Sequence, residues 1–258
     1  MRFSIITITY NNLAGLETTR ASILTQINRD FEWIVVDGAS TDGTRDVLQH
    51  WQGEIATMIS ERDEGPYDAM NKGLALARGE YVLFINSGDA LAQPETLQNL
   101  SDIIRQKPYD FIYGDSIEQQ TSGAEFYKKS RSHHFVWWGM FTHHQAMAYR
   151  TEFLREFHPV YDKAFYVGAD LDLTWRILKK TKQIKKVNFP IGRFAPAGIS
   201  ANHANAGRME QLTMRHRYMH CPALINVLIM LAQKCVWGLR QKSPKLYQIF
   251  RLKSAVSS

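Results

Sequence analysis

Cysteine is scarce in this sequence, since only Cys221 and Cys235 occur among 258 residues. Neither thiol has a histidine pair nearby at the spacing of a zinc finger, and two thiols do not make the disulfide framework of a small secreted domain. The N-terminus also lacks the apolar core and cleavage site of a signal peptide. We therefore expect a protein that stays in the reducing cytoplasm.

Glycine-rich phosphate loops are absent as well. The sequence contains no G-x-x-x-x-G-K-[ST] motif, and no G-x-G-x-x-G follows a predicted strand. The turn after the first predicted strand, residues 10–12, has no glycine. These absences argue against P-loop enzymes, dehydrogenases and nucleotidyltransferases. A nucleotide diphosphate bound here would need a metal ion to neutralise much of its charge.

Acidic residues are almost missing from the C-terminal part of the chain. Residues 208–258 hold nine Lys/Arg and one acid, Glu210, so this segment carries +8, whereas the whole chain carries +6. A basic tail on a near-neutral body indicates an anionic surface as partner; the alternative is a tail that only aids solubility. We expect no nucleic-acid partner, because the tail lacks aromatic residues interleaved with basic ones on a recognisable module.

What is present is a regular alternation of strand-like and helix-like segments, which indicates right-handed βαβ units. We predict an α/β fold, with a mostly parallel central sheet flanked by helices. Residues 1–207 form the main domain, and 208–258 form a basic helical appendage. The predicted strands are 4–9, 31–36, 81–85, 110–114 and 184–194, an antiparallel hairpin is expected before residue 131, and the helices include 13–26, 67–79, 94–106 and 151–157.

Residues 59–89 are the stretch on which the rest of the prediction depends. They indicate a strand end, an acidic loop, a helix with Gly79 as left-handed cap, a buried strand and a polar turn ending on Asp89. Asp89 and Asp37, each after a strand, lie at the sheet edge where open α/β folds bind ligands. Either acid can bond a base or ribose or hold a divalent cation, although single strand-end aspartates are more often turn or cap residues.

A second pair of acids, Asp170 and Asp172, lies in the first turn of another predicted helix. Acids there suit the positive helix N-terminus, so a purely structural role as caps is open at this point. His144 stands in an apolar setting before Gln145, where a structural histidine with satisfied hydrogen bonds is the common case. These residues alone therefore do not decide a function.

Six segments resemble, in their order, family 2 glycosyltransferases of the GT-A fold: SIITITYNN, VVDGASTDGT, SERDEGPYDAMNKGLALARGEYVLFINSGD, HHQAMAYR, GADLDLTWRIL and APAGIS. The resemblance covers about residues 3–220 and is greatest to the bacterial branch that builds colanic acid, other exopolysaccharides and O-antigens. It implies a GT-A (Rossmann-like) fold. It also implies transfer of a sugar from a nucleotide-sugar donor, with inversion at the anomeric carbon.

The resemblance gives the donor-side candidates their roles. Asp37 matches the acid that bonds the nucleobase, and Thr9 and Tyr10 line the same pocket. Asp89 matches the last acid of the turn that coordinates Mn²⁺ or Mg²⁺ on the diphosphate, while Asn86 stands where many relatives have an acid. The remaining donor-side candidates are Glu61, Asp68, Asn71, Lys72 and Ser87, with Lys72 either reaching a phosphate or belonging to a solvated helix face.

On the acceptor side, Asp170 matches the acid that acts as general base in the family. Asp172 looks supportive, through Arg176, but the assignment of the base to one of the two acids stays open. The resemblance places His144 near the acceptor, and Arg176 is a further acceptor-side candidate.

The substrates follow only in outline. UDP-sugars are the favoured donors and GDP-fucose is the alternative, because Asp37 suits the N–H of uracil or of guanine. The expected acceptor is a growing glycan on a polyprenyl diphosphate. The alternative function is a non-catalytic sugar-nucleotide-binding or scaffold protein of the same assembly complex.

The apolar tail segment 223–239 is interrupted by Asn226, Gln233 and Lys234, and its 17 residues are at the lower limit for spanning a membrane. Asn226 and Gln233 are seven apart and so share one helix face. An interfacial helix on anionic lipid fits this pattern, which places the protein peripherally at the inner face of the cytoplasmic membrane. The alternative is a helix packed on the domain or in a homo-oligomer.

Overall fold

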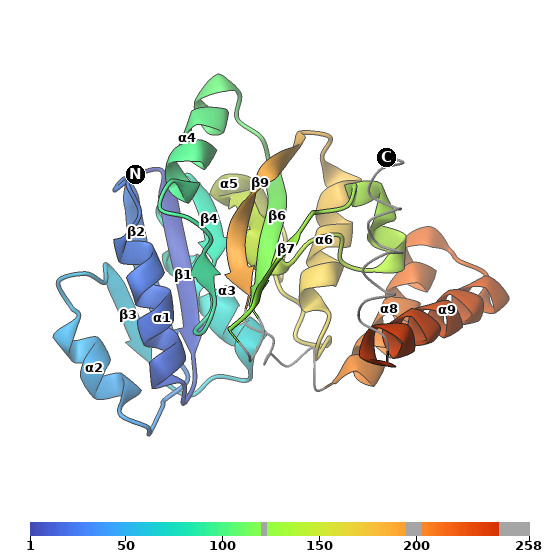
Figure 1. Cartoon of the computed structure of the whole chain (residues 1–258), viewed down its shortest axis with the longest axis horizontal. Helices are drawn as coiled ribbons and strands as arrows, with labels where there is room; N and C mark the ends of the chain where they lie inside the picture. The colour runs from blue at the N-terminus through green and yellow to red at the C-terminus, as the bar shows by residue number, and fades with distance from the viewer. Residues whose placement is uncertain (120–122, 195–202, 243–258) are drawn as a thin grey trace.

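The computed structural model describes residues 1–119, 123–194 and 203–242, and the APAGIS segment of the sequence lies outside them. A mixed sheet of nine strands forms the centre of the molecule (Figure 1), in the order β3-β2-β1-β4-β8-β6-β9-β5, with β7 paired to β6. The strands are β1 (Phe3–Thr9), β2 (Phe31–Asp37), β3 (Thr57–Ser60), β4 (Tyr81–Phe84), β5 (Ala90–Leu91), β6 (Phe111–Gln119), β7 (Glu125–Lys128), β8 (Met147–Arg150) and β9 (Ile184–Phe194).

The helices lie on both faces of this sheet and beyond one of its ends. They are α1 (Leu13–Leu24), α2 (Thr44–His50), α3 (Pro66–Leu76), α4 (Thr96–Gln106), α5 (Thr151–Leu154), α6 (Ala169–Lys180), α8 (Ala204–Met219) and α9 (Ala223–Lys242), with short 3-10 helices η1 (His133–Trp138) and η2 (His144–Ala146). The α/β fold with a mostly parallel sheet and C-terminal helices is therefore confirmed.

Strands β3, β2, β1 and β4 pair in parallel, and β6 and β9 form a second parallel pair. Thr9 pairs with Asp37, and Asp37 pairs with Ser60, so three polar residues meet at one edge. The strand β8 then runs antiparallel between β4 and β6. The predicted hairpin before residue 131 is confirmed as β6 and β7.

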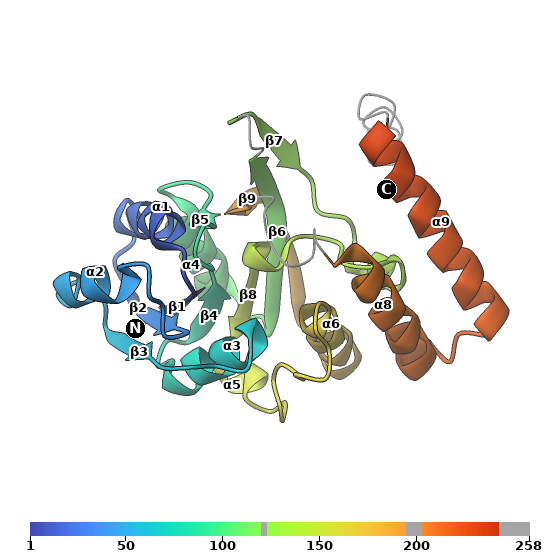
Figure 2. The same cartoon turned by 90° about the horizontal axis from the view of Figure 1, so that it is seen from below.

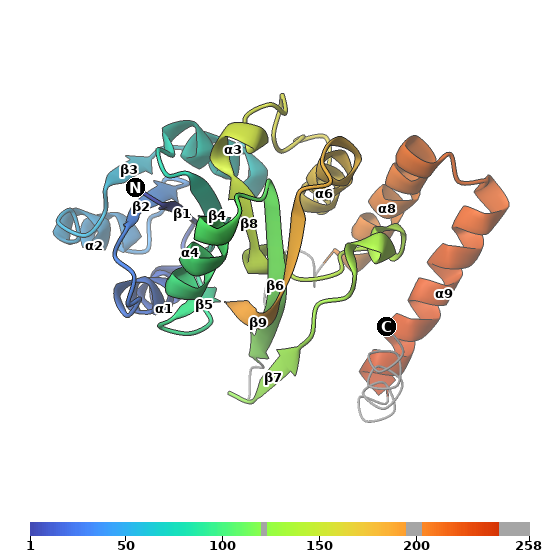
Figure 3. The ribbon, with the colours of Figure 1, turned by 90° about the horizontal axis from the view of Figure 1, so that it is seen from above.

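Two hydrophobic cores, one on each face, account for the apolar strands. In β4, Val82 and Phe84 belong to the core under α3 and α6, while Leu83 belongs to the core under α1 and α4. Figures 2 and 3 show these two pairs of helices on opposite faces. Because both faces are covered, the central strands are buried on both sides, and their polar side chains Ser4, Thr7 and Glu32 are buried as well.

The predicted cap at Gly79 is wrong. Helix α3 ends at Leu76, and Ala77 already has extended backbone angles, with φ −62° and ψ 133°. A Cβ atom on Gly79 would lie 2.5 Å from the backbone of Phe3 and Ser4. Glycine is therefore required for the close approach of this segment to β1, not for a left-handed turn.

The C-terminal helices form a hairpin outside α6, and α9 is the outermost element (Figures 2 and 3). The helix α9 turns Asn226 inward, where its amide donates to the Leu212 carbonyl at 2.8 Å and its side-chain oxygen accepts from Arg215 at 2.6 Å. Among the helices described, none has the length and apolar content needed to cross a membrane. The division at residue 207 stays a prediction.

Candidate active site

Asp37 lies where the carboxyl ends of β2 and β3 meet. Its side chain is fully buried. The carboxylate accepts from the Ser40 N–H at 3.2 Å, from the Ser40 hydroxyl, and from the Ser60 hydroxyl at 2.7 Å. These bonds fix the turn after β2. To bond a nucleobase, the role that the sequence predicts, Asp37 must exchange one of these donors for the base.

Thr9 and Tyr10 lie beside this turn, at the end of β1. The Thr9 hydroxyl is buried without a hydrogen-bond partner among the described residues, whereas Tyr10 is 66% exposed. A Cβ atom on Gly38 would lie 2.7 Å from a carboxylate oxygen of Asp63 and 3.2 Å from the Tyr10 ring. Sequence reasoning missed Asp63. Asp63 lies in the acidic loop that follows β3, whose last residue, Ser60, pairs with Asp37 in the sheet. Its place in that loop is the sequence feature that could have indicated it.

The turn after β4 carries Asp89, and a hydroxyl on α1 holds it. Thr19 donates to the Asp89 carbonyl at 2.6 Å and accepts from the Gly88 N–H at 3.1 Å. The Asp89 carboxylate accepts from the Gln145 amide at 2.6 Å. The side-chain oxygen of Asn86, in the same turn, is buried without a partner in the described part of the chain.

This turn suits a divalent cation. A carboxylate and an amide oxygen are the hard ligands that Mg²⁺ and Mn²⁺ prefer. The unpartnered Asn86 oxygen is the observation that favours such a role, since a buried acceptor without a donor is costly. No group of three or more His, Cys, Asp or Glu side chains suited to a metal occurs in the residues described.

Three further donor-side candidates form a charged cluster beside α3. Lys72 pairs with Glu61 at 2.7 Å and with Asp68 at 3.5 Å, and it also donates to the Arg62 carbonyl. The hydrogen bond that Lys72 donates to Glu61 raises the pKa of Lys72. Asp68 also pairs with Lys163 at 3.1 Å. The ammonium group of Lys72 is already paired with two acids of this cluster. A phosphate must therefore displace one of these acids to reach Lys72.

Asn71 and Ser87 brace the backbone. The Asn71 amide donates to the Tyr161 carbonyl at 2.9 Å and accepts from the Tyr161 N–H at 3.0 Å. Ser87 donates to the Asn12 carbonyl at 3.0 Å, and Asn12 itself caps α1. The structure therefore commits both side chains to fixing loops around the site.

Asp170 lies in the first turn of α6 with few hydrogen-bond donors around it. The recorded partner of its carboxylate is the N–H of Leu171, at 2.7 Å. Burial raises the pKa of Asp170 to about 6, and the charge of Glu210 adds to this effect. Its charge acts in turn on the hydroxyls of Tyr67, Tyr149 and Tyr161. Asp170 is thus a carboxyl group that exchanges its proton closer to neutral pH than an ordinary aspartate does.

Asp172, two residues along, has the opposite environment. It accepts from Arg176 at 2.8 Å and from the Tyr218 hydroxyl at 2.6 Å, and Arg217 lies 3.7 Å away. Arg176 also donates to the carbonyls of Pro159 and Val160. Asp172 and Arg176 therefore hold α6 and the preceding loop together, which favours Asp170 over Asp172 as the reactive acid.

His144 lies between the two groups of candidates. It is 8% exposed and its ring lies 5.8 Å from that of Phe84, which also contacts Tyr161. Burial lowers the pKa of His144 to about 4, so the imidazole is neutral at pH 7. Its Nε2 and the Tyr161 hydroxyl are buried without partners among the described residues. These two polar atoms therefore belong to side chains that both contact the Phe84 ring.

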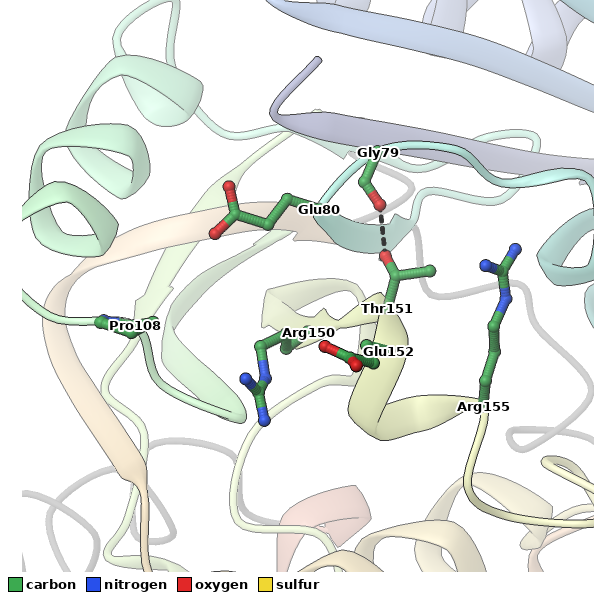
Figure 4. A pocket seen from close by; sticks show the side chains of 7 residues that line it. All are labelled: Gly79, Glu80, Pro108, Arg150, Thr151, Glu152 and Arg155. Atoms are coloured by element: carbon green, nitrogen blue, oxygen red, sulfur yellow. Dashed lines mark hydrogen bonds between the residues drawn. The ribbon is translucent and has the colours of Figure 1, made fainter.

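A cavity of about 560 Å³ lies elsewhere in the molecule, and Figure 4 shows the residues that line it. Its position before β4 and after β8 puts it at the sheet edge opposite to Asp37 and Asp89. Arg150, one of its charged residues, pairs with Asp110 at 2.6 Å. The cavity is therefore separate from the candidate site. Its lining residues are Gly79, Glu80, Pro108, Arg150, Thr151, Glu152 and Arg155.

Comparison with known proteins assigns this arrangement to a family. Residues 4–165 match the family model described as "Glycosyl transferase family 2". The chain is 35% identical over 188 residues to a "PGL/p-HBAD biosynthesis glycosyltransferase" of Mycobacterium bovis, covering 67% of this chain and 68% of that protein.

Solved structures share the fold. The chain is similar to Staphylococcus aureus TarS 1–349 in complex with UDP, with a TM-score of 0.66 and 19% identity over 89% of this chain and 70% of that one. It is also similar to the mannosyltransferase PcManGT of Pyrobaculum calidifontis in complex with GDP-Man and Mn²⁺, with a TM-score of 0.62 and 18% identity over 99% and 79% of the two chains.

Proposed function

Because the chain belongs to glycosyl transferase family 2, we propose that it is an inverting enzyme that moves a sugar from a nucleotide-sugar donor to a bacterial cell-surface glycan. The observation that carries this proposal is the environment of Asp170, a half-buried acid in the first turn of α6 whose pKa is raised to about 6 by burial. The unpartnered His144 Nε2 and Tyr161 hydroxyl nearby are suited to bond a sugar.

Asp170 acts as the general base. The acceptor hydroxyl loses its proton to the Asp170 carboxylate while its oxygen attacks the anomeric carbon of the donor sugar. The bond from that carbon to the nucleoside diphosphate breaks on the opposite side, which inverts the configuration. A raised pKa makes this carboxylate a stronger base than an ordinary aspartate while leaving it ionised at pH 7.

The donor lies across the carboxyl ends of β1, β2 and β4. We assign the nucleobase to the pocket of Thr9, Tyr10 and Asp37, with Asp63 as an added wall. A UDP-sugar is the favoured donor, and TarS 1–349 has been solved with UDP-GlcNAc. GDP-fucose is the alternative, and PcManGT has been solved with GDP-Man. Lys72 reaches the diphosphate once an acid of its cluster moves away.

Asp89 and Asn86 are the residues that would hold Mn²⁺ or Mg²⁺. Bound there, the cation would neutralise the charge that develops on the leaving diphosphate. Gln145 orients the Asp89 carboxylate through its 2.6 Å hydrogen bond. Because the turn offers one carboxylate, the donor phosphates must complete the coordination, which couples metal binding to donor binding.

The acceptor is a glycan on a polyprenyl diphosphate, which approaches along His144 and the loop that Arg176 holds. The helix α9 suits such a membrane-bound acceptor. It buries Asn226 against α8 and exposes Leu224 by 74% and Leu228 by 56%. An apolar face beside a strongly basic segment fits an anionic bilayer. Arg215, by contrast, is buried, so it does not contribute to this attraction.

Vesicle sedimentation tests the membrane proposal. We expect the full-length protein to co-sediment with phosphatidylglycerol-containing vesicles at low salt and to be partly released at high salt. Leu228→Asp should weaken this binding without changing the melting temperature by more than a few degrees, because that side chain faces solvent. Equal binding to neutral vesicles, or none to anionic ones, would contradict it.

The enzymatic proposal is tested by a thermal-shift screen with UDP-glucose, UDP-galactose, UDP-GlcNAc, GDP-mannose and GDP-fucose, with and without Mn²⁺. We expect one nucleotide class to raise the melting temperature, more so with metal. Release of the nucleoside diphosphate from the selected donor then measures turnover. A donor that binds tightly without turnover on any lipid-linked acceptor would favour the alternative, a non-catalytic sugar-nucleotide-binding protein of the same assembly complex.

A further inference from the structure

Glu210 is the single acid of residues 208–258, and it is directed at the catalytic part of the protein. Its carboxylate accepts from three successive backbone N–H groups, those of Tyr166 at 2.7 Å, Val167 at 3.1 Å and Gly168 at 2.7 Å. No ion pair of Glu210 is recorded within the described residues. The recorded hydrogen bonds of the Glu210 carboxylate therefore all come from backbone N–H groups of one short loop.

That loop leads directly into α6. Its last residue, Gly168, is the N-cap of α6 and provides no side-chain cap. From the other side, the Tyr67 hydroxyl donates to the Val167 carbonyl. A Cβ atom on Gly168 would lie 3.1 Å from the Glu210 carboxylate. Glu210 and Tyr67 therefore fix the segment that ends two residues before Asp170.

We propose that Glu210 is a positioning residue for the catalytic base: it fixes the loop 166–168 so that Asp170 enters the sugar site in one orientation. This inference rests on the proposed function of Asp170. It makes α8 part of the catalytic unit, although α8 touches neither the donor edge nor the metal-binding turn in any recorded contact.

The charge of Glu210 gives the proposal a second, measurable consequence. The titratable groups around Asp170 are Tyr67 from α3, Tyr149 from β8 and Tyr161 from the preceding loop, whose hydroxyls its charge affects, and Glu210 from α8. Glu210 is the group among them whose charge raises the pKa of Asp170. Its removal must therefore lower the pKa of Asp170, because a nearby negative charge disfavours the ionised acid.

The test is a carboxyl ¹³C NMR titration of aspartate-labelled full-length protein, with the Asp170 resonance assigned from Asp170→Asn. We expect Asp170 to titrate at a lower pH in Glu210→Gln than in the wild type. Turnover should fall roughly ten- to a hundredfold, the usual cost of a misplaced catalytic group. The Kd for the donor selected in the screen should change by less than about twofold.

Glu156→Gln is the matched control. Glu156, which follows α5, pairs with Lys180 at the other end of α6, at 2.7 Å, so this variant removes an acid that contacts the same helix without changing its first turn. Its Asp170 titration and its turnover should match those of the wild type. A shift of equal size in both variants would mean that Glu210 acts only through general charge, and would overturn the proposal.

Glu210→Asp covers the case in which Glu210→Gln does not fold. The shorter acid keeps the charge but cannot reach all three N–H groups, so we expect the wild-type titration with reduced turnover. Wild-type turnover in this variant overturns the proposal, as does an unchanged Asp170 titration in folded Glu210→Gln. If Glu210→Gln shifts the titration but the wild type transfers no sugar, the positioning role stands and the proposed function fails.

Discussion

Aspartates lie both at the donor edge of the sheet, where the carboxyl ends of β1, β2 and β4 meet, and in the first turn of α6. Their hydrogen-bond partners differ between the two regions. At the donor edge, Asp37 is surrounded by serine donors and Asp89 by a glutamine. In the α6 turn, Asp170 is half-buried, its charge acts on three tyrosine hydroxyls, and its recorded hydrogen-bond donor is one backbone N–H. The two regions therefore differ in the kind of donor around the carboxylate: side-chain hydroxyl and amide groups at the donor edge, and a backbone N–H in the α6 turn.

The largest expected effect is at the donor edge. Asp89→Asn should abolish transfer and remove the stabilisation of the donor complex by Mn²⁺, because the turn 86–89 offers no second carboxylate. Nucleoside diphosphate release and thermal shift measure the two results. Asp102→Asn, on the exposed side of α4, is the control. Metal-dependent turnover that survives in Asp89→Asn would contradict the assignment.

In the α6 turn, Asp170→Asn should lower turnover by roughly 10²–10⁴, the usual share of general base catalysis. Donor binding should stay nearly unchanged, because Asp170 makes no recorded contact with the donor edge. Steady-state turnover and donor Kd separate the two terms. A loss of donor affinity equal to the loss of turnover would place Asp170 at the donor edge and remove the contrast between the two regions.

Asp172→Asn sharpens the comparison within α6 itself. Its carboxylate holds Arg176 and Tyr218 in a buried position, so its loss should reduce the free energy of unfolding by about 1–3 kcal/mol. Turnover should fall by less than about tenfold. Urea denaturation and the donor-release assay measure these values. If Asp172→Asn instead keeps the stability of the wild type and its turnover falls by the factor expected for Asp170→Asn, the two roles must be exchanged.

The smallest effect concerns pH and stability. Burial raises the pKa of Asp170 to about 6, whereas an ordinary aspartate titrates near 3.8. The folded state therefore holds this proton more tightly, and stability falls as pH rises from about 4 to about 6. Asp170→Asn escapes this loss, so at pH 7.5 it should be more stable than the wild type by about 1–3 kcal/mol. Melting curves at pH 4 and pH 7.5 test this, and equal differences at both would contradict it.

Much of this fold follows from local sequence patterns. The apolar runs around Val35 and Leu83 specify strands covered on both faces, and Asn12 specifies the start of α1. Asp37 and Asp89 could be placed at one sheet edge because parallel strands carry their ends to the same side.

Other parts of the site depend on contacts distant in sequence. Glu210 lies 42 residues after Gly168, and no spacing rule predicts that an acid of α8 bonds the loop that leads into α6. Asp172 and Asp170 look equivalent in sequence, and only Tyr218 and Arg176 separate them. The requirement for glycine at position 79 comes from the close approach of β1, which is a tertiary contact. Local sequence patterns do not reveal such a contact, and they indicate a left-handed turn there.

The orientation of α9 also decides how the isolated protein behaves in a test tube. With Asn226 turned inward, the side chains of Leu224, Leu228 and Leu231 face the solvent. In dilute buffer these side chains gain by contacting any apolar surface, whether detergent, column matrix or a second copy of the chain. We therefore expect the apparent mass to rise with concentration and to fall when a mild detergent is added. An oligomer measured without lipid would then result from contacts of the exposed apolar face of α9.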